Sequence, residues 1–183
     1  MTNRENVDKY IIPERKKDKE KSIVSDDGLY KLNVSWYSCN NKPEDNYWDF
    51  SRGLLTEIST GKIIADIRRN YPDFWYCFVD HPNGNKYLLC GEDYQGYTVI
   101  NCKTGERHDF LPEEAKGGFG FCWVEIINFS GTELTVCGCH WACPFENVTY
   151  DFSIPEKQPY PELLREYENY EDLEDEDEDL END

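Results

Sequence analysis

The sequence predicts an all-β protein of antiparallel strands, and three observations lead to this prediction. Residues 23–155 consist of short runs rich in Val, Ile, Phe, Tyr and Trp, the side chains most enriched in strands. Pairs of turn residues ending in Gly separate these runs at fairly regular distances. Aromatic residues are frequent, with 13 Tyr, 9 Phe and 5 Trp, and they supply the large buried areas that a compact β domain needs.

Length and pattern divide the chain into three parts. Its 183 residues allow one domain with a substantial core. Residues 1–22 mix both charge signs with almost no hydrophobic pattern, which predicts a flexible charged arm. Residues 23–161 are the predicted β domain. In residues 162–183, apolar side chains recur at helical spacing from Leu163 to Tyr170, so we expect a short helix followed by a disordered acidic tail.

Five turn pairs predict the hairpins of the β domain. In each pair Gly supplies the positive φ that a tight hairpin demands. The pairs are Asp27-Gly28, Thr60-Gly61, Asn83-Gly84, Thr104-Gly105 and Ser130-Gly131.

The turn pairs also indicate an internal repeat of three units, each with four strands. Gly84 and Gly131 precede corresponding apolar runs and are 47 residues apart, and Gly61 and Gly105 are 44 residues apart. Repeats of this length are typical of propeller blades and similar arrays.

The order of aromatic run, Gly turn, two strands, Thr-Gly turn and closing strand resembles the four-stranded blade of WD-type and related β-propellers over residues 23–155. The resemblance implies antiparallel blades. Closed propellers usually have 4 to 8 blades, whereas this chain has three. Three arrangements therefore stay open: an incomplete propeller, a ring closed by association of copies such as a homo-dimer, or a β-meander or sandwich.

A second resemblance concerns the segment GCHWACPFE, residues 138–146. It is similar to a segment of uncharacterised proteins, and the composition, rich in Asn, Tyr and acidic residues, is similar to that of proteins from AT-rich genomes, including giant DNA viruses. This resemblance implies no activity.

The net charge of -19 is concentrated at the C-terminal end. Residues 162–183 contain 13 acidic residues and one basic residue, Arg165, which gives -12. Such a chain repels a phosphate backbone, so we expect no direct binding of nucleic acid and a protein partner with a basic surface.

The start of the chain lacks the apolar stretch of a secretory signal, and no apolar run is long enough to cross a bilayer. We therefore expect a cytoplasmic or nuclear protein, or one of the host cytoplasm or virion if it is viral. In such a compartment the 8 cysteines stay reduced or bind metal.

Four potential ligands for a soft metal lie within seven residues: Cys137, Cys139, His140 and Cys143. Zinc accepts this set in tetrahedral geometry. However, strand periodicity places Cys137 and Cys139 on one face and His140 on the other, so a single metal requires a bend at His140. The alternatives are buried thiols packed beside Trp141, or an oxidation-sensitive pair of Cys139 and Cys143.

The loop GEDYQGY presents four polar side chains between glycines: Glu92, Asp93, Tyr94 and Gln95. It is either a recognition loop or an ordinary polar turn. Exposed aromatic residues anchor many interfaces, so Trp141 joins these four as a candidate binding residue.

No known signature of a catalytic site occurs in the sequence, and we assign no catalytic residue. The sequence therefore predicts a non-enzymatic protein–protein interaction module that needs no cofactor. The alternative is a zinc-stabilised or thiol-redox protein that uses the cluster from Cys137 to Cys143.

Overall fold

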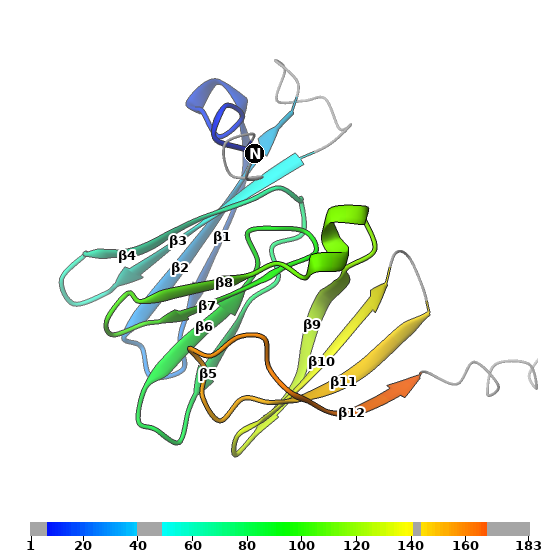
Figure 1. The fold of residues 1–183 in the computed structure, drawn as a ribbon. Coiled ribbons are helices and arrows are strands. Elements are labelled where there is room, and N and C mark those ends of the chain that lie inside the picture. Colours follow the sequence, from blue (N-terminus) through cyan, green and yellow to red (C-terminus); the bar gives the residue numbers. More distant parts are fainter. Residues whose placement is uncertain (1–6, 40–48, 141–143, 168–183) are drawn as a thin grey trace, which may run out of the picture.

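The computed structural model describes residues 7–39, 49–140 and 144–167, which form twelve strands and two short 3-10 helices (Figure 1). Three antiparallel sheets of four strands follow one another along the chain. Sheet A contains β1 (Lys16–Val24), β2 (Tyr30–Ser38), β3 (Asp49–Glu57) and β4 (Ile63–Arg69). Sheet B contains β5 (Cys77–Asp80), β6 (Lys86–Cys90), β7 (Tyr97–Asn101) and β8 (Arg107–Phe110). Sheet C contains β9 (Phe121–Ser130), β10 (Glu133–His140), β11 (Phe145–Asp151) and β12 (Glu162–Tyr167). The 3-10 helices are η1 (Pro13–Arg15) and η2 (Glu113–Gly117).

The predicted fold class is confirmed: the described residues form three four-stranded antiparallel units. In each sheet, strands that are consecutive in sequence are also neighbours in space, and each of the two edge strands pairs with one described strand, so none of the three sheets is a closed barrel.

All five predicted turn pairs lie in hairpins between consecutive strands, and their Gly residues have φ between 62° and 83°. At Gly84, between β5 and β6, φ is 83° and an added Cβ would meet no atom within 4 Å. The backbone conformation, and not a lack of space, therefore favours Gly at this turn.

The three sheets stack with sheet B in the middle (Figure 1). Every residue of β6 and β7 is buried. Because neighbouring side chains of a strand point to opposite faces, Leu88 packs in a core shared with sheet A, while Leu89 packs in a core shared with sheet C. Sheet A contributes Leu32 and Leu55 to the first core, and sheet C contributes Leu134 to the second.

Strands that occupy the same place in the strand order of their sheets lie near one another in the stack. On one side, the ammonium of Lys21 in β1 lies 5.0 Å from the centroid of the Tyr76 ring, which precedes β5. On the other side, Arg107 of β8 donates a hydrogen bond of 3.5 Å to the Asp66 carbonyl of β4. The connection into β12 follows the second side, because Gln158 donates to the carbonyl of a β8 residue, His108, at 3.3 Å. Thus β1 and β12 lie on opposite sides of the stack.

The prediction that residues 1–22 form a flexible arm is wrong for residues 7–22, which the structure describes. Residues 16–24 form edge strand β1, which pairs with β2 from Glu20 to Val24. The preceding segment packs on sheet A, where Val7 is 1% exposed and the ring of Tyr10 stacks on Phe50 at 4.6 Å. An edge strand can form backbone hydrogen bonds with one neighbouring strand even when its sequence contains no hydrophobic run. The hydrophobic pattern alone therefore does not predict β1.

The predicted C-terminal helix is also wrong, because residues 162–167 form strand β12. The pairing with β11 runs from Tyr150 opposite Glu162 to Glu146 opposite Tyr167. As a fourth strand, β12 forms hydrogen bonds with backbone groups of β11 that would otherwise lie at an open edge. These bonds stabilise the segment more than a helix of two turns or fewer would. The tail beyond residue 167 lies outside the described residues.

No helix in the described ranges has the length and apolar character that a membrane span requires.

Candidate functional site

The loop that contains Glu92, Asp93, Tyr94 and Gln95 joins β6 to β7. Glu92 pairs with Arg107 of β8 at 2.5 Å, and its carboxylate accepts a hydrogen bond from the backbone N–H of Arg68 in β4 at 3.2 Å. The Glu92 carbonyl accepts a further bond from the backbone of Asn70 at 3.0 Å. The loop is therefore fastened to sheet A.

The other end of the loop is fastened to the segment that leads into sheet C. The Gln95 amide donates to the Gly118 carbonyl at 3.1 Å and accepts from the Gly120 backbone at 3.0 Å. The Asp93 carboxylate accepts from the Gln95 backbone at 3.1 Å, which closes the turn. These bonds place the loop at the junction of all three sheets.

Tyr94 fills the space between the loop and two neighbouring segments. Its ring packs against Tyr71 with centroids 4.4 Å apart, and its hydroxyl forms a hydrogen bond with the Cys122 thiol. Burial, followed by the nearby Cys122, raises the pKa of Tyr94 to about 12. The phenol is thus neutral at physiological pH.

A buried arginine holds the junction together. The side chain of Arg69, at the end of β4, donates to the carbonyls of Asp73, Gly91 and Asp93 at 2.6, 2.7 and 3.0 Å. The residue is 2% exposed, and burial lowers its pKa to about 10. This role could not be predicted from sequence, since nothing in RRNYPD marks one Arg as buried. The junction residues make structural contacts, and a recognition role for the 92–95 loop stays a prediction.

The metal donors that the sequence brings together do not converge in the structure. Cys137 pairs with Asn147 and Cys139 with Phe145, so the two thiols share one face of β10. His140 lies on the opposite face, where its ring is 5.1 Å from that of Phe121. Cys143 and Trp141 lie outside the described residues. Within the described part of the chain, no group of three or more His, Cys, Asp or Glu residues is placed to hold a metal ion.

The buried thiols have the character of core residues. Cys139 lies directly opposite Cys122 on the paired strands, and the two are 5% and 2% exposed. Burial raises the pKa of Cys122 and raises those of Cys90 and Cys102 to about 12. Because the thiolate is the nucleophile, these cysteines are poorly suited to covalent catalysis at neutral pH.

The three histidines make separate local contacts. His81 Nε2 lies 3.1 Å from the Phe152 carbonyl, and His108 Nε2 lies 3.1 Å from the Glu106 carboxylate. His140 Nδ1 lies 3.2 Å from the Phe119 carbonyl. These contacts do not include the thiol–imidazole pair that a cysteine nucleophile requires.

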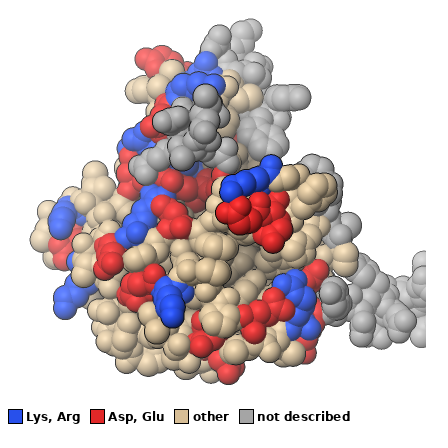
Figure 2. Space-filling model, in the orientation of Figure 1, with Lys and Arg blue, Asp and Glu red and all other residues tan. Residues whose placement is uncertain are grey.

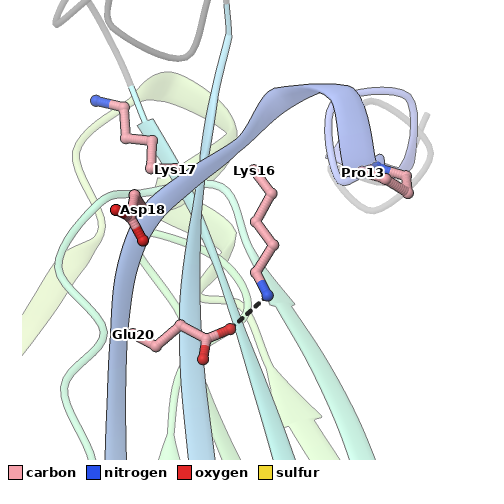
Figure 3. Close-up of a pocket in the computed structure, with 5 residues that line it drawn as sticks. All are labelled: Pro13, Lys16, Lys17, Asp18 and Glu20. Atoms are coloured by element: carbon pink, nitrogen blue, oxygen red, sulfur yellow. Dashed lines mark hydrogen bonds and ion pairs between the residues drawn. The ribbon is translucent and has the colours of Figure 1, made fainter.

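An open hollow beside η1 is lined by charged residues of β1 (Figure 3). Its lining residues are Pro13, Lys16, Lys17, Asp18 and Glu20. Lys16 pairs with Glu20 across it, and Lys17 pairs with Asp49 at 2.8 Å. The hollow therefore carries charges of both signs, and its lysines already have partners within the chain. The face in Figure 2 likewise shows basic and acidic side chains interspersed.

The exterior of sheet A, which faces away from sheet B, is covered by the chain itself. Val7 and Tyr10 pack on the exterior residues Tyr37 and Phe50. Beside them, Asp66 accepts two hydrogen bonds from Arg52, at 2.8 and 2.9 Å, and two from Arg68, at 2.9 and 3.2 Å. Arg68 also pairs with Asp8 at 2.8 Å, which fastens the N-terminal segment to the sheet.

The exterior of sheet C is buried at one end, where Cys122 and Cys139 lie near Tyr94, and is more open along the rest of its described residues. The strand register shows which residues lie on this exterior, because exterior residues alternate along each strand with interior residues such as Leu134 and Val136. Exterior residues that pair across the four strands form rows. One exterior row is Asn128, Thr135, Thr149 and Leu164, and the next is Glu125, Cys137, Asn147 and Glu166. The hydroxyls of Thr135 and Thr149 are 2.9 Å apart and bond to each other.

Apolar side chains remain exposed around this exterior. Leu164 is 52% exposed on the exterior face of β12. Val124 and Ile127, at the two register shifts of edge strand β9, are 45% and 51% exposed. These residues were not predicted from sequence, because the spacing of Leu164 favours a helix and no pattern marks Val124 and Ile127 of β9 as exposed. Alternation in ENVTYD, which pairs with β12, was the available signal.

Comparison with known proteins identifies one relative of unknown role. An uncharacterised protein of Acanthamoeba polyphaga mimivirus is 35% identical to this chain over 149 residues, which are 81% of the chain and 57% of that protein. The chain thus corresponds to little more than half of the relative's length. No family model matches the chain, and no solved structure matches it.

Proposed function

We propose that the chain is a non-enzymatic protein-interaction module whose contact surface is the exterior of sheet C. One observation carries this proposal. The two ends of the stack are equivalent in architecture, but Val7 and Tyr10 cover part of the exterior of sheet A, whereas Leu164 is exposed on the exterior of sheet C and Val124 and Ile127 are exposed on its edge strand β9. Exposed apolar side chains on and beside one face are typical of interaction surfaces.

The chemistry of this face indicates the kind of partner. Thr135 and Thr149 share one hydrogen bond, so each hydroxyl keeps a partner when the centre of the face loses water. Glu125 and Glu166 lie at opposite ends of the adjacent row, on β9 and β12. We therefore infer a protein partner with an apolar centre and basic residues at its rim.

The contacts of the histidines and thiols support binding over catalysis. Cys122 and Cys139 are buried, and His81 and His140 contact backbone carbonyls. The similarity to a mimivirus protein supports a giant-virus origin, and we propose the host cytoplasm or the virion as the place of action.

The test uses two leucines of the same strand. Leu163 and Leu164 are 54% and 52% exposed, but only Leu164 pairs in register with exterior residue Thr149, while Leu163 falls at a register shift. We would purify wild type, Leu164→Lys and Leu163→Lys from native host cells and quantify the bound proteins by mass spectrometry. A lysine buried at an apolar contact should weaken binding by at least about tenfold.

We expect one protein to be retained by wild type and by Leu163→Lys and to be lost from Leu164→Lys. That protein, once purified, should bind directly to wild type and to Leu163→Lys more tightly than to Leu164→Lys. Sedimentation of the purified chain alone shows whether that partner is a second copy. A protein that remains monomeric and retains no partner in an Leu164-dependent manner would contradict the proposal.

A further inference from the structure

Two lysines on edge strand β1 carry charge that no described carboxylate neutralises. The Lys19 ammonium lies 4.3 Å from the centroid of the Trp36 ring, and that of Lys21 lies 5.0 Å from the centroid of the Tyr76 ring. Both lysines are exposed. Cation–π contact holds each ammonium in place but leaves its N–H donors available to an anion. We call Lys19 and Lys21 the lysine strip.

Neighbouring lysines differ from the strip in this respect. Lys16 pairs with Glu20, and Lys17 pairs with Asp49 at 2.8 Å. Lys86 pairs with Asp80 at 2.6 Å and with a second aspartate. Within the described ranges, neither lysine of the strip forms an ion pair, so positive charge remains at this part of the edge.

The backbone of β1 adds a second recognition element. β1 is the edge strand of sheet A and pairs with β2 alone among the described strands. Its outward backbone groups can bind an extended segment, and side chains of opposite charge on that segment would pair with the lysines. The natural ligand is therefore an extended acidic peptide.

The chain itself contains such a peptide. Residues 168–183 include 11 acidic and no basic residues. We propose that this acidic segment binds the lysine strip of the same molecule, with its carboxylates paired to Lys19 and Lys21. The contact goes beyond the protein-interaction role assigned to sheet C, since it uses the opposite end of the stack.

The reach of the segment allows this contact. Sixteen extended residues span roughly 50 Å. The path from β12 to β1 crosses two sheet spacings of about 10 Å and a sheet width of about 15 Å, which gives roughly 35 Å in all. Tethering keeps the acidic residues at a local concentration on the order of millimolar, so weak pairs suffice.

Zero-length cross-linking of carboxylates to amines with a carbodiimide tests the proposal on the full chain. We would map links by mass spectrometry in the monomeric product. We expect links from Lys19 and Lys21 to residues 168–183, and about tenfold fewer at 0.5 M salt, because screening weakens exposed ion pairs.

The variants are matched by exposure. Lys19→Gln/Lys21→Gln removes the strip, and Lys62→Gln/Lys103→Gln removes two exposed lysines from the hairpins after β3 and β7. In Lys19→Gln/Lys21→Gln, any remaining links from the tail should be to other lysines and no more frequent than chance contact allows. In Lys62→Gln/Lys103→Gln, the tail should link to Lys19 and Lys21 at the wild-type level. Far-ultraviolet circular dichroism confirms that each variant is folded.

Two outcomes overturn the proposal: tail links that are no more frequent at Lys19 and Lys21 than at Lys62 and Lys103, or strip links found only in dimeric product. The second would assign the strip to the tail of another copy. Neither outcome bears on sheet C, because Leu164 and the strip are tested by separate variants.

Discussion

The exteriors of sheets A and C differ in how the described residues of the chain cover them. Both sheets pack one face on sheet B, and each leaves the other face at an end of the stack. Sheet A covers its exterior with the chain's own residues, through the packing of Tyr10 on Phe50 and the pair of Arg68 with Asp8. Sheet C keeps exposed apolar side chains such as Leu164. Our proposal places the partner on the end face that the described residues cover less.

The largest expected effect tests what the two sheets share. Leu55 in sheet A and Leu134 in sheet C are both 0% exposed and both face sheet B. We expect Leu55→Ala and Leu134→Ala each to lower the free energy of unfolding by about 2–5 kcal/mol, measured by urea denaturation. If one of the two costs less than about 1 kcal/mol, that sheet does not pack on sheet B as described.

The cover of sheet A should contribute measurably to stability. Tyr10→Ala removes the ring that stacks on Phe50, and we expect a loss of about 1–2 kcal/mol, smaller than for a core residue because Tyr10 is only partly buried. Hydrogen exchange should also increase in residues 7–15. A matched change on sheet C, Leu164→Ala, should cost less than about 0.5 kcal/mol, since Leu164 is half exposed.

The ion pairs of sheet A predict a pH dependence of stability that the uncharged pair of Thr135 and Thr149 on sheet C should lack. Burial opposes ionisation of Asp66, but hydrogen bonds from Arg52 and Arg68 outweigh it and lower the pKa of Asp66 below its usual value of 3.8. The folded state thus holds the proton less tightly than the unfolded state, so this stabilisation is fully present above about pH 4 and is lost as the pH falls through the folded pKa.

We expect Asp66→Asn to cost about 1 kcal/mol at pH 7 and less near pH 2, measured by denaturation at both values. Thr149→Val, which breaks the hydroxyl pair on sheet C, serves as the control and should show the same small cost at both pH values. An Asp66→Asn cost that does not change with pH would contradict the assignment of the ion pair.

The smallest expected effect concerns zinc. Cys137 and Cys139 share the exterior of sheet C, while His140 lies on the other face. We therefore expect protein purified under reducing conditions to contain well below one zinc per chain, and a chelator to leave the midpoint of thermal unfolding unchanged. Stoichiometric zinc measured by mass spectrometry would support the alternative of a zinc-stabilised protein and would require His140 to turn.

Part of the candidate sites could be predicted from sequence. Strand periodicity correctly separated His140 from Cys137 and Cys139, because alternation is a local property of extended backbone. The surface that we propose for contact could not be found in this way. Leu164 has the same local pattern in a helix or a strand, and only pairing with Thr149 places it on the exterior. The burial of Arg69 was also invisible, because its partners are carbonyls from distant segments such as Gly91.

The sequence by itself determined the all-β class, the five Gly hairpins and the three four-stranded units, since turn chemistry and strand composition act between near neighbours in the chain. Only the tertiary structure decided that residues 16–24 and 162–167 are edge strands, and that sheet B lies between the other two. Edge pairing and stacking depend on which backbone groups and apolar faces remain unsatisfied after the hairpins form. That balance is set by contacts between residues far apart in sequence, so no local pattern records it.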